Sequence, residues 1–181
     1  MSEELEVLKE VSRRLKEAGI PYMITGSIAS NFYAVPRMTR DIDIVVELKP
    51  RDAEKIYEIF TTDFYIDQDV VKAEVAREGM FNIIHNKYVV KVDFIVKKDT
   101  EYRREEFLRR RPIQVEGTEL FLTAPEDLII SKLEWAKKSH SEMHLKDAKN
   151  ILDSVKDLDN GYLQKWTAKL GISELLREVM T

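Results

Sequence analysis

The sequence predicts an α+β fold, with a mixed sheet in the first two thirds of the chain and helices in the last third. Apolar residues occupy every second position over residues 41–47 and again over 88–96, which is the period of a half-buried β-strand. From Ala124 onward the apolar residues recur at helical spacing instead. Strands followed by a run of helices are typical of α+β proteins. We therefore expect a core over residues 1–122 and a helical C-terminal region over 123–181, packed on that core.

Helical spacing and chain-breaking residues place the predicted helices. Leucine and valine recur at helical spacing over residues 3–18, and Gly19 and Pro21 end that helix. Pro50 fits the first turn of a later helix. The predicted helices cover residues 3–18, a short segment after Gly26-Ser27 up to about 34, and residues 51–60, 69–77, 125–138, 145–157 and 160–180, the last broken near Gly171.

Apolar runs and turn signals place the predicted strands. The strand over 41–47 carries Asp41 and Asp43 on one face and apolar residues on the other. The next two apolar runs are joined by Asn86-Lys87, a spacing that predicts a two-residue hairpin. The predicted strands cover residues 22–25, 41–47, 80–85, 88–96 and segments within 113–122.

Composition excludes several classes of protein. The 181 residues include no cysteine, which excludes disulfides and thiolate metal sites. With 29 basic and 33 acidic residues the net charge is −4, so no global charge favours nucleic acid. No apolar run approaches the roughly 20 residues that span a membrane, and the acidic N-terminus is unlike a signal peptide. We therefore expect a soluble, cytoplasmic protein.

Basic residues and histidines give weaker signals. The five arginines between residues 103 and 111 favour a solvated face, and a contact with RNA or phosphate is the alternative. We expect His85, His140 and His144 to be surface or turn residues rather than ligands.

Three aspartates suggest a metal site. Asp41 and Asp43, two positions apart on a strand, point the same way and offer the oxygen ligands that Mg²⁺ prefers. Asp93 lies on the polar face of a second strand, so the three carboxylates converge if the two strands are neighbours. Close carboxylates repel unless a cation or a proton intervenes. The alternatives are a polar sheet face, acids that cap a strand entry, and pairing of Asp93 with Lys91 or with water.

Gly26-Ser27 stands where a strand ends and a helix begins. Glycine permits close approach of the backbone, and a helix N-terminus offers N–H groups to a phosphate. Ser27 as an ordinary N-cap is the alternative.

The order of these motifs resembles a known signature. An apolar strand, Gly-Ser, a short helix and an acidic-apolar-acidic strand (MITGSIASNFYAVPRMTRDIDIVV) resemble the nucleotidyltransferase superfamily, whose fold is an α/β/α core with a mixed sheet. KVDFIV, with Asp93, resembles the segment of its third carboxylate. The resemblance implies that Gly26 and Ser27 hold nucleotide phosphates. It also implies that Asp41, Asp43 and Asp93 are catalytic and hold Mg²⁺.

The segment TAPEDLIISKLEWAKKSHSEMHLKDAKNIL resembles the AbiEii/MenT-type toxin branch of that superfamily. The resemblance implies that Lys132, catalytic and nucleotide-binding, and Asp147, nucleotide-binding, join the active site. Lys132 shares a helical face with apolar residues, so we expect it to point inward, and snorkelling at the core edge is the alternative. Asp147 either orients Lys132 or caps its helix. Arg37 either neutralises phosphate charge or covers the sheet edge.

Two functional hypotheses follow, besides a chance match of the motif. The first is an Mg²⁺-dependent nucleotidyltransferase that moves a nucleoside monophosphate from an NTP such as ATP to a hydroxyl. The acceptor is a tRNA end, a protein side chain or a small molecule. The second is a non-catalytic binding module of the same fold or a toxin–antitoxin component. A partner protein or a homo-oligomer fits either hypothesis, and no membrane partner is expected.

Overall fold

A seven-stranded mixed sheet organises the protein; the structure, a computed structural model, describes residues 2–181. The spatial order is β3-β4-β5-β2-β1-β7-β6. β2 pairs with β5, and β1 with β7, in parallel, whereas the other neighbouring strands are antiparallel. The strands are β1 (Tyr22–Thr25), β2 (Asp41–Val46), β3 (Phe64–Tyr65), β4 (Met80–His85), β5 (Lys91–Val96), β6 (Arg111–Val115) and β7 (Thr118–Leu122).

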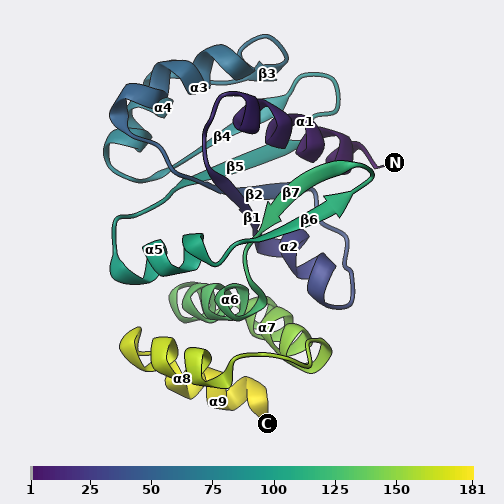
Figure 1. Cartoon of the computed structure of the whole chain (residues 1–181), viewed down its shortest axis with the longest axis vertical. Helices are drawn as coiled ribbons and strands as arrows, with labels where there is room; N and C mark the ends of the chain where they lie inside the picture. The colour runs from purple at the N-terminus through teal and green to yellow at the C-terminus, as the bar shows by residue number, and fades with distance from the viewer. Residues whose placement is uncertain (1) are drawn as a thin grey trace.

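Helices cover both faces of the sheet (Figure 1). α1, α3 and α4 lie on one side, and α5 and the C-terminal helices lie on the other. α2 begins directly after β1 and packs against α6 and α7. The helices are α1 (Glu3–Glu17), α2 (Gly26–Tyr33), α3 (Ala53–Phe60) after a 3-10 turn (Pro50–Asp52), α4 (Gln68–Ala76), α5 (Glu101–Leu108), α6 (Pro125–Ser139), α7 (Glu142–Ser154), α8 (Asn160–Lys169) and α9 (Ser173–Met180).

This architecture confirms the predicted mixed α/β core with a helical C-terminal region. The break between α8 and α9 at Gly171 is also confirmed; Gly171 has φ +67° there. The domain boundary after residue 122 stays a prediction. No helix within residues 2–181 is both long and apolar enough to cross a membrane.

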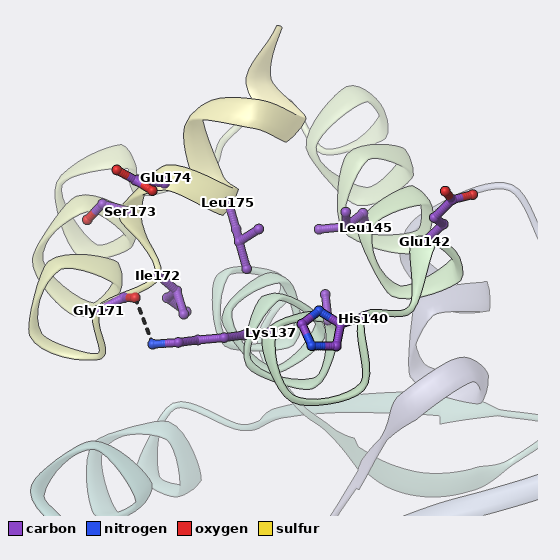
Figure 2. A pocket seen from close by; sticks show the side chains of 10 residues that line it. Lys137, His140, Glu142, Leu145, Gly171, Ile172, Ser173, Glu174 and Leu175 are labelled. Carbon is purple, nitrogen blue, oxygen red and sulfur yellow. Dashed lines mark hydrogen bonds between the residues drawn. The ribbon is translucent and has the colours of Figure 1, made fainter.

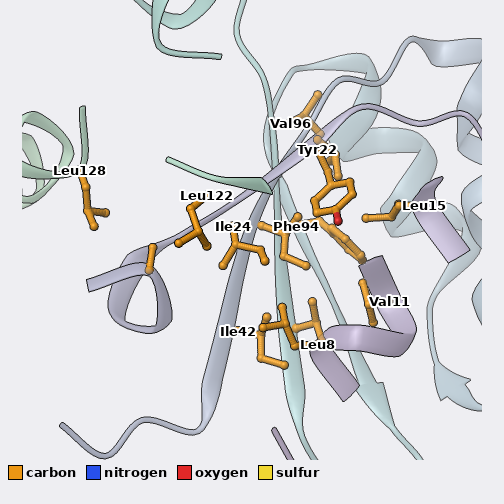
Figure 3. Packing of buried hydrophobic residues seen from close by; sticks show 14 of the residues in the cluster. Leu8, Val11, Leu15, Tyr22, Ile24, Ile42, Phe94, Val96, Leu122 and Leu128 are labelled. Atoms are coloured by element: carbon orange, nitrogen blue, oxygen red, sulfur yellow. The ribbon is translucent and has the colours of Figure 1, made fainter. Parts of the chain in front are cut away.

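The alternation in β2 and β5 gives the sheet two different faces. On one face Ile42 and Phe94 are fully buried, and Figure 3 shows Leu8, Val11 and Leu15 of α1 close to them. Burying a side chain of this size contributes roughly 1.5–3 kcal/mol to stability. The intervening residues of the same strands face the other way, so the core fixes the direction in which the aspartates point.

The predicted two-residue hairpin is wrong. The backbone N–H of His85 donates to the carbonyl of Val90 (2.9 Å), and five residues, Asn86–Val90, separate β4 from β5. The ring Nδ1 of His85 accepts the N–H groups of Lys87 (3.3 Å) and Tyr88 (3.2 Å). The imidazole thus fixes the backbone of the loop, in which Val89 adopts φ +54°. The second strand begins at Lys91 rather than at Tyr88.

The arginine-rich stretch forms an element that the sequence did not predict. Arg103 in α5 donates to Glu106 (2.8 Å) and to Glu134 of α6 (2.5 Å), and Arg109 donates to Asp127 (2.9 Å). Arg103 and Arg109 are therefore partly buried in ion pairs rather than on a solvated face, and a contact with RNA or phosphate stays a prediction. We call the group that fastens α5 to α6 the α5–α6 ion cluster; it comprises Arg103, Glu106, Arg109, Glu126, Asp127 and Glu134.

Candidate active site

Parallel pairing of β2 and β5 brings the three aspartates onto one face of the sheet. Asp43 lies directly opposite Asp93, and Asp41 lies opposite Lys91. β1 lies on the other side of β2 and ends with Thr25, which pairs with Asp43. Gly26 is the next residue and begins α2 beside that carboxylate. The structure therefore places Asp43 and Asp93 side by side, with Asp41 two residues along the same face of β2; a shared metal stays a prediction.

Lys91 supplies the positive charge between these strands. Its Nζ lies 2.8 Å from Oδ2 of Asp93 and 3.8 Å from Oδ1 of Asp41. The structure therefore also contains the pairing of Asp93 with Lys91 that the sequence left open as an alternative. Within residues 2–181, no three His, Cys, Asp or Glu side chains are already arranged as a metal cluster. A divalent cation at these carboxylates has to share them with the Lys91 ammonium or displace it.

Asp43 shows that the local charge is not balanced. Burial and the neighbouring Asp93 raise the pKa of Asp43 to about 6, and the charges of Lys132 and Lys91 only partly oppose this. A bound cation would stabilise the charged form of this partly buried carboxylate beside Asp93. The oxygen-only donor set of Asp41, Asp43 and Asp93 therefore fits Mg²⁺.

Only glycine fits at position 26. Gly26 has φ +65°, and a Cβ built on it would lie 2.0 Å from Oδ2 of Asp43. The backbone at the start of α2 consequently lies against the Asp43 carboxylate. Thr25 is the N-cap of α2 and gives no side-chain cap, so the alternative of Ser27 as the N-cap is wrong. The first N–H groups of α2 are thus not capped by a side chain, and they can bind a phosphate.

A second charged network joins α2, α6 and α7. Lys132 is 3% exposed, and its Nζ donates to Asp147 (2.8 Å), so the snorkelling alternative is wrong. Arg37 donates to both carboxylate oxygens of Asp147 (3.2 and 3.1 Å) and to Oγ of Ser27 (2.5 Å). Burial raises the pKa of Asp147, but the hydrogen bonds from Arg37 and Lys132 outweigh it and hold that pKa below its usual range. Asp147 lies inside α7 rather than at its end, and it orients two cations.

A pocket of about 550 Å³ connects the two groups. Gly26, Ser27, Asp43 and Lys132 line it, whereas Asp41 and Asp93 do not; Asp93 pairs with Asp43 on the neighbouring strand. Asp147 contacts it through Lys132. This volume accommodates a small organic ligand.

Comparison with known proteins decides the family. Residues 4–169 match the model of the family described as "Nucleotidyl transferase of unknown function (DUF2204)". The chain belongs to this family. This nucleotidyl transferase is therefore an enzyme of the class that transfers a nucleoside monophosphate. The search of curated proteins found no relative.

Solved structures share the fold of this nucleotidyl transferase. An antigenic nucleotidyltransferase-like protein from Paracoccidioides brasiliensis is 19% identical, with 97% of this chain and 93% of that chain covered and a TM-score of 0.59. A putative nucleotidyltransferase from Thermotoga maritima is 20% identical (78% and 90% covered, TM-score 0.53). The lincomycin-bound lincosamide antibiotic adenylyltransferase LnuA is 11% identical (86% and 98% covered, TM-score 0.54). At these identities the likeness shows the fold alone.

The sequence did not single out two further residues of the pocket in this nucleotidyl transferase. His144 lines the pocket, and its buried Nδ1 has no hydrogen-bond partner within residues 2–181. Burial and the charge of Lys132 lower the pKa of His144. His144 is partly buried in the first turn of α7, whereas His85, 6% exposed, is no surface residue. Trp135 follows Lys132 by one helical turn, a spacing that could have revealed it.

A second hollow, of about 660 Å³, lies away from these residues (Figure 2). It is bounded by α6, α7 and the start of α9, and Lys137 donates across it to the carbonyl of Gly171 (3.0 Å). None of the residues predicted for the active site lines it.

Proposed function

We propose that this protein is an Mg²⁺-dependent nucleotidyltransferase that moves a nucleoside monophosphate from an NTP to a hydroxyl acceptor. The observation that carries the proposal is the register of the site. Asp43 lies opposite Asp93, and Gly26 lies against Asp43 at the N-terminus of α2. One short segment of the sheet thus holds a carboxylate group next to backbone N–H groups suited to phosphate.

The protein's own charges suit a triphosphate. The N–H groups at the start of α2 and the Ser27 hydroxyl would bind phosphate oxygens. Lys132 and Arg37, both fixed by Asp147, would face the charge that develops as pyrophosphate leaves. Cations that are already oriented stabilise such charge without reorganisation.

Asp41, Asp43 and Asp93 would hold the metal. When bound, Mg²⁺ would neutralise triphosphate charge and favour ionisation of the acceptor hydroxyl. In the proposed step the acceptor oxygen bonds to the α-phosphorus while the bond to the pyrophosphate oxygen breaks. The proton of the hydroxyl passes to the Asp93 carboxylate, whose Oδ2 lies 2.8 Å from Nζ of Lys91.

The acceptor is a tRNA end, a protein side chain or a small molecule. LnuA by its name acts on an antibiotic, and the net charge of −4 gives no general attraction for RNA; both favour a small molecule. Membership of the AbiEii/MenT-type branch, with a partner protein, is supported by the contact between Lys132 and Asp147. A non-catalytic module is disfavoured because all three acids remain together.

A thermal-shift panel tests the proposal. ATP, GTP, CTP and UTP are compared with and without Mg²⁺, since a ligand that binds only the folded state raises Tm. We expect a shift that requires Mg²⁺ and that disappears in Asp41→Asn/Asp43→Asn. The exposed Asp69→Asn is the control and should keep the shift. Absence of any shift in the wild type, or an equal shift in the double variant, contradicts the assignment.

A further inference from the structure

The floor of the pocket changes from charged to apolar within one step of the sheet. Val45 lies two residues after Asp43 on β2, and Ile95 lies two residues after Asp93 on β5. Val45 pairs with Ile95, and Ile95 pairs with Met80 of β4, so the three side chains form one row across three strands. All three line the pocket. We call them the apolar row.

Trp135 of α6 lines the same pocket. It follows Lys132 by three positions, so both side chains leave the same face of α6. Trp135 is 43% exposed, whereas Trp166 is 2% exposed and belongs to the core. The Nζ of Lys138 lies 5.6 Å from the centre of the Trp135 ring. An indole exposed on the wall of a pocket offers a flat surface for a ligand ring.

The pocket offers two kinds of surface that match the two parts of one ligand class. Gly26, Ser27 and Lys132 suit phosphates, while the apolar row and Trp135 suit a flat ring. Further charged residues, among them Lys97, Arg103 and Glu134, also line the pocket. A nucleotide carries both parts on a single molecule. A sugar acceptor has no flat ring, and a simple polyphosphate uses only the surface that suits phosphates.

We propose that the apolar row and the indole of Trp135 form the nucleobase subsite of this enzyme, with the base stacked on Trp135. The proposal rests on the proposed function and adds to it a donor preference. Stacking and apolar burial respond to ring area, so the larger purines bind more tightly than pyrimidines.

Substitution of Trp135 separates the base from the phosphates. Affinities for ATP, CTP and inorganic tripolyphosphate are measured by calorimetry in Mg²⁺, for the wild type, Trp135→Ala and Trp135→Phe. Removal of a stacking aromatic is worth about 10- to 100-fold in affinity. We expect that loss for ATP in Trp135→Ala, a smaller loss for CTP, an unchanged affinity for tripolyphosphate, and recovery of most ATP affinity in Trp135→Phe.

Fluorescence gives an independent measurement. ATP should quench the emission of the wild type, whereas tripolyphosphate should not. Trp135→Phe should not respond, because its remaining Trp166 is buried in the core. The exposed Tyr65→Ala, on the edge strand β3, is a control that should behave as the wild type.

The outcomes separate the two proposals. Unchanged ATP affinity in Trp135→Ala overturns the nucleobase subsite and leaves the proposed function standing. An equal loss for ATP and tripolyphosphate also overturns the subsite, since the effect then lies at the surface that suits phosphates. If the wild type binds neither ATP nor tripolyphosphate, the proposed function itself is wrong, and the subsite falls with it.

Discussion

The α5–α6 ion cluster and the three site aspartates both gather carboxylates at the edge of the core, but they balance charge differently. In the cluster, Asp127 accepts hydrogen bonds from Arg109 and from the hydroxyl of Tyr162 (2.6 Å). At the site, Lys91 contacts two aspartates, and Asp43 has no ion pair in the part of the chain described. Every carboxylate of the cluster accepts a hydrogen bond from an arginine. Asp43 has no ion-pair partner within residues 2–181, so its carboxylate can bind a cation from solution.

The largest expected effect is on the cluster. In Asp127→Ala, Arg109 and Tyr162 lose a fully buried acceptor. Breaking a buried pair typically costs 3–5 kcal/mol, and we expect a loss near that size in urea unfolding. The exposed pair of Arg104 and Asp99 provides the control, because Asp99→Ala should leave the free energy of unfolding nearly unchanged. Equal effects of the two variants would show that the cluster is not structural.

A smaller effect concerns pH. Burial, only partly opposed by Arg103, raises the pKa of Glu106 to about 7, so the folded state binds its proton more tightly than the unfolded chain does. That group therefore lowers stability progressively as pH rises from about 4.5 to 7. Between pH 5 and pH 8 we expect Glu106→Gln to gain roughly 1–3 kcal/mol relative to the wild type. Parallel stability curves for the two proteins would refute this.

The site aspartates should respond with the opposite sign to Asp127. Asp43→Asn removes a partly buried charge beside Asp93 without changing the side-chain shape. We expect the free energy of unfolding at pH 7.5 to rise by about 1 kcal/mol, while Mg²⁺-dependent nucleotide binding is lost. A destabilisation as large as that of Asp127→Ala would make Asp43 structural.

The smallest predicted effect tests whether Lys91 competes with metal. Lys91→Met removes the cation that pairs with Asp93 and Asp41. The affinity for Mn²⁺ measured by electron paramagnetic resonance should therefore rise several-fold, which corresponds to roughly 1 kcal/mol. Lys16→Met removes an equal charge from an exposed pair with Glu119 and serves as the matched control. An unchanged or weaker affinity in Lys91→Met contradicts competition.

Sequence patterns predicted the strands of the site because alternation is local. The spacing of Asp41 and Asp43 settled their common face, and the apolar positions of 91–96 settled that of Asp93. Their register could not be read locally, since it depends on β5 lying beside β2 in parallel. The metal role of these aspartates stays a prediction.

The elements that were missed lacked a local signal. β3 has only two residues. α5 is charged on most of its surface, and the residues that give its arginines their partners lie in α6, far along the chain. The place of His144 on the pocket has no local signal either, because nothing near it in the sequence shows that α7 packs against α6 there.

The pairing of Ile24 in β1 with Leu122 in β7 has a consequence for the order of folding. Gly26 and the three aspartates are all synthesised before residue 94, whereas Lys132 follows β7. A nascent chain therefore holds the acidic half of the site before its buried cation exists. The step in which β7 joins β1 and brings in α6 also brings Lys132, which opposes part of the negative charge at Asp43, so closing the core and completing the site are one event.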